Sequence, residues 1–160
     1  MSNFIHGSII CFSLKQIPYS TIKNELIMYC KSNEFSIQFS EVVIKKEETI
    51  IKFQLSDNDS IKYCENFMEP IFYDTEGKPV LEGLLKDIEK LKGMVRNIFS
   101  FESVKRLELR FSFVEVDEEE YTIHKTSIND MERIILNQYL HSINMPTIEI
   151  LIEKTGDGVL

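Results

Sequence analysis

Hydrophobic and polar residues repeat with two different periods along this chain, and each period predicts its own kind of element. Strict alternation over 35–45 and 49–56 predicts a hairpin with one dry and one wet face, joined by a turn at 46–48. Residues 3–14 are apolar on both sides of the predicted strand, which favours a central place in a sheet. A final strand is predicted at 148–152 from isoleucine at every second position.

Helical spacing of apolar residues marks four further segments, at about 18–32, 59–72, 80–99 and 127–142. The third is the best defined. Its apolar residues form one continuous stripe: Leu81, Leu84, Leu85, Ile88, Leu91, Val95, Ile98 and Phe99. Between the second and third helices, the sequence YDTEGKP at 73–79 predicts a loop.

Residues 104–116 predict a long strand, and their pattern changes side before it ends. The inward positions are Leu107, Leu109, Phe111 and Phe113. The apolar side then switches between 113 and 114, which predicts a bulge, a sharp twist or a departure from the sheet. The chain is expected to turn at 117–119 and to return as a short strand at 121–124, so the two strands would form a hairpin.

These elements predict one α+β domain over residues 1–154, followed by a loose tail at 155–160. The expected order is β-α-β-β-α-α-β-β-α-β, with about six mostly antiparallel strands and about four helices. The first part matches the split βαβ order called ferredoxin-like, with one extra helix. The predicted core includes Leu84, Ile88, Leu91, Leu107, Leu109 and Phe111.

Composition narrows the class of protein further. The 160 residues carry 18 Lys and Arg against 26 Asp and Glu, a net charge of −8, which argues against direct nucleic-acid binding. No apolar run approaches the roughly 20 residues of a membrane span, and the N-terminus has no signal-peptide pattern. Cys11, Cys30 and Cys64 are odd in number and form no CxxC pair, so we expect reduced, buried thiols and a cytoplasmic protein.

Signatures of catalysis and of cofactor binding are missing. The histidines His6, His124 and His141 show no HExxH or other metal-ligand spacing, and His6 and Cys11 fall on opposite faces of their strand. There is no GxSxG nucleophile elbow, and the sequence Glu76-Gly77-Lys78-Pro79 lacks the earlier glycine and the Ser or Thr of a phosphate-binding loop. We therefore expect no metal and no cofactor, and we favour a protein that is not an enzyme.

Five carboxylates crowd into six positions after the long strand: Glu115, Asp117, Glu118, Glu119 and Glu120. A solvated hairpin turn is one interpretation of this acidic segment. The other is a negatively charged tip that docks on a basic partner, because a cationic partner would relieve the mutual repulsion of the carboxylates.

Three of the four arginines, Arg96, Arg106 and Arg110, lie close together in sequence. They are candidates for an anion site, against the alternative of a wet sheet face with alternating charges. Aromatic residues do not interleave with them, which speaks against a surface that stacks RNA bases.

The sequence thus favours a non-enzymatic acidic protein that neutralises a basic protein partner such as a toxin or nuclease, in the manner of an immunity protein or nuclease inhibitor. The alternative is a small enzyme or small-ligand domain whose site is assembled from scattered histidines and acids. A homodimer is left open by the sequence.

Overall fold

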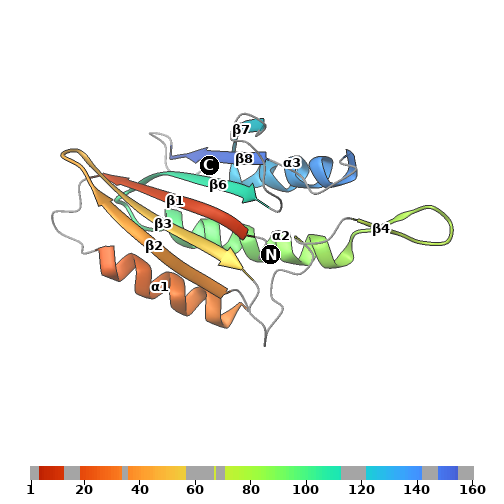
Figure 1. Ribbon diagram of the computed structural model, residues 1–160, viewed down its shortest axis with the longest axis horizontal. Helices are drawn as coiled ribbons and strands as arrows, with labels where there is room; N and C mark the ends of the chain where they lie inside the picture. The colour runs from red at the N-terminus through yellow and green to blue at the C-terminus, as the bar shows by residue number, and fades with distance from the viewer. Residues whose placement is uncertain are drawn as a thin grey trace.

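The computed structural model describes residues 4–12, 19–33, 36–56, 67, 71–112, 122–141 and 148–154 (Figure 1). The helices and strands within these ranges are β1 (Phe4–Phe12), α1 (Tyr19–Ser32), β2 (Ser36–Ile44), β3 (Glu48–Ser56), β4 (Phe72–Tyr73), β5 (Pro79–Val80), α2 (Glu82–Phe99), β6 (Val104–Ser112), β7 (Thr122–Thr126), α3 (Ile128–His141) and β8 (Ile148–Glu153).

Six of the strands form one sheet in the order β2-β3-β1-β6-β8-β7. All neighbours are antiparallel except β7 and β8, which are parallel. The expected α+β domain with a mostly antiparallel sheet of six strands is confirmed. The central place of β1, between β3 and β6, is also as predicted.

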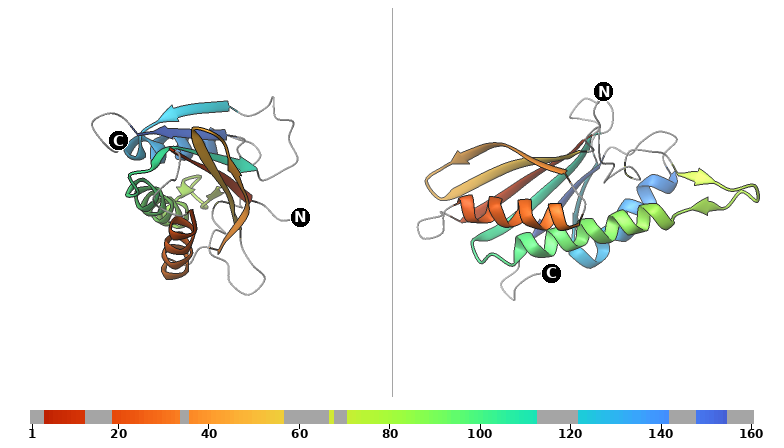
Figure 2. Two further views of the ribbon diagram at one scale, coloured as in Figure 1. Left: turned by 90° about the vertical axis from the view of Figure 1, so that its left-hand side faces the viewer. Right: turned by 90° about the horizontal axis from the view of Figure 1, so that it is seen from below.

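The three helices α1, α2 and α3 all lie on one face of this sheet, as the view from below in Figure 2 shows. Period-two alternation explains this arrangement, because it gives each strand one apolar face that needs cover. The six residues predicted as core are all buried, with at most 5% of Leu84 exposed. The rings of Phe67 and Phe111 meet edge to face at 5.8 Å between centroids, and the Phe67 ring lies 6.4 Å from that of Tyr139 on α3.

A close approach in the central strand depends on a missing side chain. Gly7 of β1 faces the core between Ile5 and Ile9, and a Cβ atom there would collide with the ring of Phe53 on β3. Because glycine leaves this space free, the Phe53 ring crosses β1 and is itself almost fully buried. The same ring lies 6.3 Å from that of Phe39 on the edge strand β2.

The structure corrects the sequence prediction around residue 72. The second predicted helix, 59–72, falls almost entirely outside the described residues, and Phe72 belongs to a strand rather than a helix. Residues 73–79, expected as a loop, are the end of a two-stranded hairpin in which Phe72 pairs with Val80 and Tyr73 with Pro79. The described part of the chain therefore holds three helices where four were predicted for the whole.

The predicted hairpin between 104–116 and 121–124 is wrong. Strands β6 and β7 are not neighbours, because β8 lies between them and pairs with both. Burial explains why β8 rather than β7 lies next to β6. Every second residue of β8 is buried, which suits an inner strand, whereas Ile123 and Lys125 of β7 are exposed, which suits an edge strand. The side switch predicted at 113–114 and the tail at 155–160 lie outside the described residues.

Replacing Phe111 by Ala tests the assignment of the core. Its ring is fully buried against Phe67, so we expect Phe111→Ala to lower the free energy of unfolding by roughly 3–5 kcal/mol. Urea denaturation followed by circular dichroism measures this loss. The control is Ile123→Ala, which removes a 65% exposed side chain and should change stability by no more than about 0.5 kcal/mol. Equal losses in the two variants would contradict the assignment.

Candidate functional site

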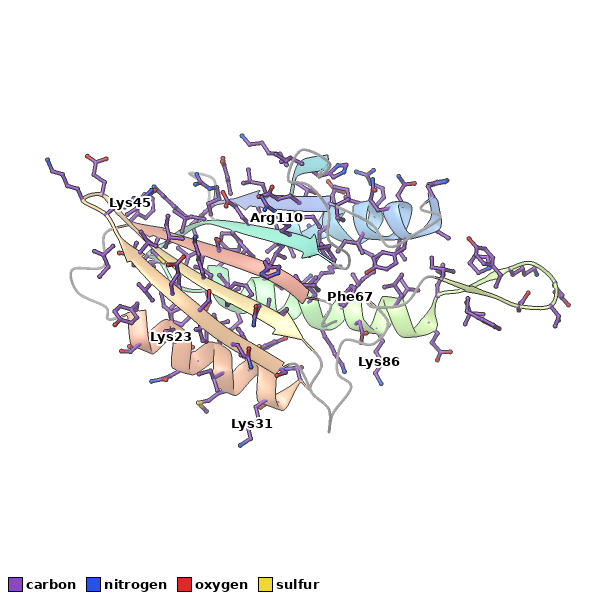
Figure 3. All side chains as sticks on the ribbon, in the orientation of Figure 1. Lys23, Lys31, Lys45, Phe67, Lys86 and Arg110 are labelled. Atoms are coloured by element: carbon purple, nitrogen blue, oxygen red, sulfur yellow. The ribbon has the colours of Figure 1, made fainter. Side chains whose placement is uncertain are left out.

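The sheet face opposite the helices, which we call the open face, carries a network of polar and charged side chains. One row of neighbours crosses all six strands on this open face: Gln38, Gln54, His6, Arg110, Glu149 and Ile123. Gln54 Nε2 donates to Gln38 Oε1 at 2.9 Å, and Arg110, labelled in Figure 3, donates from Nη2 to Glu149 Oε2 at 3.4 Å. Alternation in each strand places these side chains together, since the residues between them face the core.

Among the described residues, opposite charges on the open face form five ion pairs. The pairs and their N···O distances are Lys105–Glu48 at 2.7 Å, Lys52–Glu41 at 3.0 Å, Arg106–Glu108 at 3.3 Å, Arg110–Glu149 at 3.4 Å and Lys125–Glu153 at 3.8 Å. Lys105 and Lys45 also lower the pKa of Glu48, mainly through the hydrogen bond from Lys105. These five pairs contribute five cations and five anions, so together they add no net charge to the described part of this face.

The three arginines proposed as an anion site do not come together. Arg106 and Arg110 share the open face of β6, as expected, and each is paired with a glutamate. Arg96 lies on α2, and the sheet separates it from the other two. The pairing matches the alternative of a wet sheet face with alternating charges.

The three histidines occupy separate places. His6 is on the open face, His124 is on β7 opposite Ile150, and His141 ends α3. Within the described ranges, no group of three or more His, Cys, Asp or Glu side chains could hold a metal ion. The helices that the structure describes include none long and apolar enough to cross a membrane.

The acidic segment Glu115, Asp117, Glu118, Glu119 and Glu120 lies outside the described residues, and the structure shows where it is attached. It leaves the sheet after Ser112 of β6 and re-enters at Thr122 of β7. Ser112 pairs with Phe4 at the start of β1. Thr122 pairs with Ile148, the first residue of β8, and the next residue, Glu149, pairs with Arg110 near the end of β6. Both attachments are therefore at one end of the sheet, on strands two positions apart, or about 10 Å.

A second acidic stretch leaves from the same end. Strand β3 ends at Ser56, and its residue Leu55 pairs with Ile5 at the start of β1. Residues 57–70 follow, with Asp57, Asp59, Glu65 and Glu69 against a single Lys62, a net charge of −3. Since β3 and β6 flank β1, this stretch begins about 10 Å from the start of the segment 113–121, which carries −5.

The excess negative charge of the protein resides in such connections. The described residues contain 16 Lys and Arg against 15 Asp and Glu, a net charge of +1. The whole chain carries −8, so the remaining residues carry −9, of which the two acidic connections supply −8.

Sequence reasoning missed one exposed feature, the hairpin of β4 and β5, which we call the arm (residues 71–81). It extends away from the body at the N-terminal end of α2 (Figure 1). Phe72 is 71% exposed, and Tyr73 and Val80 are each 48% exposed. The available signal was the pair of short apolar runs on either side of a turn sequence, and strands of two residues are too short for periodicity to reveal.

Comparisons of the chain with protein-family models, with curated proteins and with solved structures found no match.

The two described cysteines are free and buried, and burial raises the pKa of Cys11 to about 11 and that of Cys30 to about 12. The thiolate is the reactive form, so both should resist iodoacetamide at neutral pH and react quickly in denaturant. Mass spectrometry after a timed pulse reports each residue separately. Rapid labelling of Cys11 or Cys30 in the folded protein would contradict a structural role. Cys64 lies outside the described residues.

His6 gives a pH test of the open face. Partial burial and the neighbouring Arg110 lower its pKa below the ordinary 6.5, so the unfolded chain binds the proton more tightly than the folded protein does. The stability associated with neutral His6 is present above 6.5 and is lost as the pH falls towards the lowered pKa. We expect His6→Gln to become more stable relative to the parent as the pH falls from about 7.5 to about 5. Urea denaturation of both proteins measures the difference; a constant difference would contradict the lowered pKa.

Proposed function

We propose that this protein is an acidic, non-enzymatic binding protein that neutralises a basic protein partner, such as a toxin or nuclease. The observation that carries the proposal is the distribution of charge. A framework of net charge +1 holds two acidic connections, of −5 and −3, attached about 10 Å apart at one end of its sheet. Like charges attached so closely repel one another in the free protein, and a cationic surface would relieve that repulsion.

The mechanism would begin with electrostatic steering and end with occlusion. A basic cleft that binds the phosphates of a nucleic acid attracts carboxylates for the same reason, since both present anionic oxygens to Lys and Arg. The acidic end would orient the two proteins during approach, and the docked protein would then cover the cleft. The balanced ion pairs of the open face contribute little net field, so this end dominates the attraction.

The open face gives less support to the alternative of a small enzyme. Such a site needs a base, an acid and a pocket that converge, and His6, His124 and His141 belong to different surfaces of the fold. Among the described residues, the hollow between α1 and α2 is shallow and is lined by Glu25, Met28, Tyr29, Ser32 and Asn97, without a histidine.

We also propose a ferredoxin-like topology for the part of the chain from β1 to β6, and a cytoplasmic location for the protein. The topology is supported by the strand order β2-β3-β1-β6, by the antiparallel pairing of these four strands and by the position of α1 and α2 on one face. A cytoplasmic location is supported by the free, buried Cys11 and Cys30, because a reducing compartment keeps thiols unpaired.

Neutralising three acids tests the proposal once a basic partner is in hand. We expect the triple change Glu118→Gln, Glu119→Gln and Glu120→Gln to slow association at least several-fold at low salt and to leave dissociation almost unchanged. The difference should shrink at physiological salt, where exposed charges are screened beyond about 8 Å. Stopped-flow kinetics at two ionic strengths measures both rates.

A matched control separates the place of the charge from its amount. Glu25→Gln, Glu89→Gln and Glu102→Gln together change the net charge equally. All three residues are exposed, with Glu25 on α1, Glu89 on α2 and Glu102 in the turn between α2 and β6. This control should associate nearly as fast as the parent. If both triple variants slow association equally, the acidic end has no special role. If the partner is itself acidic, the proposed function is wrong.

A further inference from the structure

The arm has apolar side chains on both of its faces. Directly opposed residues of an antiparallel pair point to the same side, and successive residues point to opposite sides. Phe72 and Val80 therefore share one face, and Tyr73 and Pro79 share the other. A hairpin that lies flat on a surface needs only one apolar face, so this pattern fits insertion between two walls.

The tip of the arm is built to hold its shape without help from the body. Asp74 Oδ1 accepts the backbone N–H groups of Glu76 and Lys78, both at 2.9 Å. The N–H of Asp74 donates to the carbonyl of Lys78 at 2.9 Å, and Gly77 completes the turn with a φ of +79°, which favours glycine. A preordered hairpin loses little conformational freedom on binding, which leaves more of the contact energy for affinity.

A second copy of this chain is a poor receptor for the arm. A dimer held by the arm alone would bury far less than the roughly 800 Å² per partner of a standard stable interface, because each strand of the arm has two residues. Pro79 has no N–H to extend the sheet at the β5 edge. The hollow between α1 and α2 is shallow, and Glu25, Ser32 and Asn97 make up much of its lining among the residues described there. These features point to a different protein.

The negative charge around the arm indicates that the surface surrounding its binding site on the receptor is positively charged. The arm and the adjoining residue Glu82 carry a net charge of −2, from Asp74, Glu76 and Glu82 against Lys78. Lys78 Nζ and Glu76 Oε2 lie 3.8 Å apart, and about three quarters of each side chain is exposed. An apolar cleft with a cationic rim complements both the faces and the charge of the arm.

We infer that the arm is a docking wedge, which inserts Phe72, Tyr73 and Val80 between the apolar walls of a cleft in the basic partner. This inference rests on the proposed function and assigns the association and dissociation rates to two different parts of the protein. The acidic end governs the rate of association, and the arm governs the lifetime of the complex, because buried aromatic anchors act mainly on dissociation.

A photocrosslinking experiment locates the contact. Benzoylphenylalanine is placed at position 72 or, as a control, at position 44, and the full chain is irradiated in its native cell. Ile44 is 72% exposed, nearly the same as Phe72, and it ends β2 at the opposite end of the molecule from the arm. We expect a basic protein to be captured from position 72 and not from position 44.

Kinetics with the captured protein then tests the wedge itself. Phe72→Ser and Val80→Ser together should raise the dissociation rate by at least roughly tenfold, with no dependence on salt, whereas Ile44→Ser should leave it unchanged. The arm side chains are largely exposed in the free protein, so circular dichroism and thermal unfolding should match the parent.

The other outcomes overturn the inference in distinguishable ways. A crosslink of twice the chain mass from position 72 would mean that the arm binds a second copy. An unchanged dissociation rate, in a complex whose association the Glu118–Glu120 variant slows, would remove the wedge and keep the proposed function. Capture of no protein from position 72 would remove the wedge and keep the proposed function, and capture of an acidic protein would remove both.

Discussion

The pairing of β1 with β3 on one side and β6 on the other is the constraint on which the rest of this structure depends. Both pairings are antiparallel, so β3 and β6 run in the same direction and end beside the start of β1. Gly7 makes this arrangement compact, because the Phe53 ring of β3 occupies the space that a side chain of β1 would need. The two acidic connections start from one end of the sheet as a direct consequence.

Division of the sheet into two unlike faces explains where function can reside. Helices α1, α2 and α3 bury one face, and five ion pairs neutralise the other. Among the described residues, the apolar face is thus covered by helices and the ion pairs of the other face carry no net charge. Two features remain at the periphery: the end of the sheet from which the acidic connections leave, and the apolar arm. In the function proposed above, the first would supply long-range attraction and the second short-range contact.

Local patterns in the sequence were sufficient for most of the elements and for the core. The stripe of α2 and the alternation in β6 identified Leu84, Ile88, Leu107 and Phe111 correctly, because burial on one side imposes a period that each segment carries by itself. The open face was anticipated in the same way, as alternating charges around Arg106 and Arg110.

Features that depend on contacts between segments far apart in the sequence could not be predicted from the local pattern of apolar and polar residues. No residue of 104–126 shows that β8 will pair between β6 and β7, since that choice is made by the burial needs of a later segment. The separation of Arg96 from Arg106 and Arg110 depends likewise on which side of the sheet α2 packs. The arm escaped notice because the bonds of Asp74, rather than periodicity, hold it together.

The order of strands also has a consequence for synthesis. Strands β2, β3, β1 and β6 can pair as soon as residue 112 has left the ribosome, whereas β7 has no neighbour in the sheet until β8 follows it. During that interval the outer edge of β6 presents unpaired backbone groups to the cell. The final strand therefore closes a gap between two strands already made, and a nascent chain stalled inside α3 would expose a β edge able to recruit other nascent chains into aggregates.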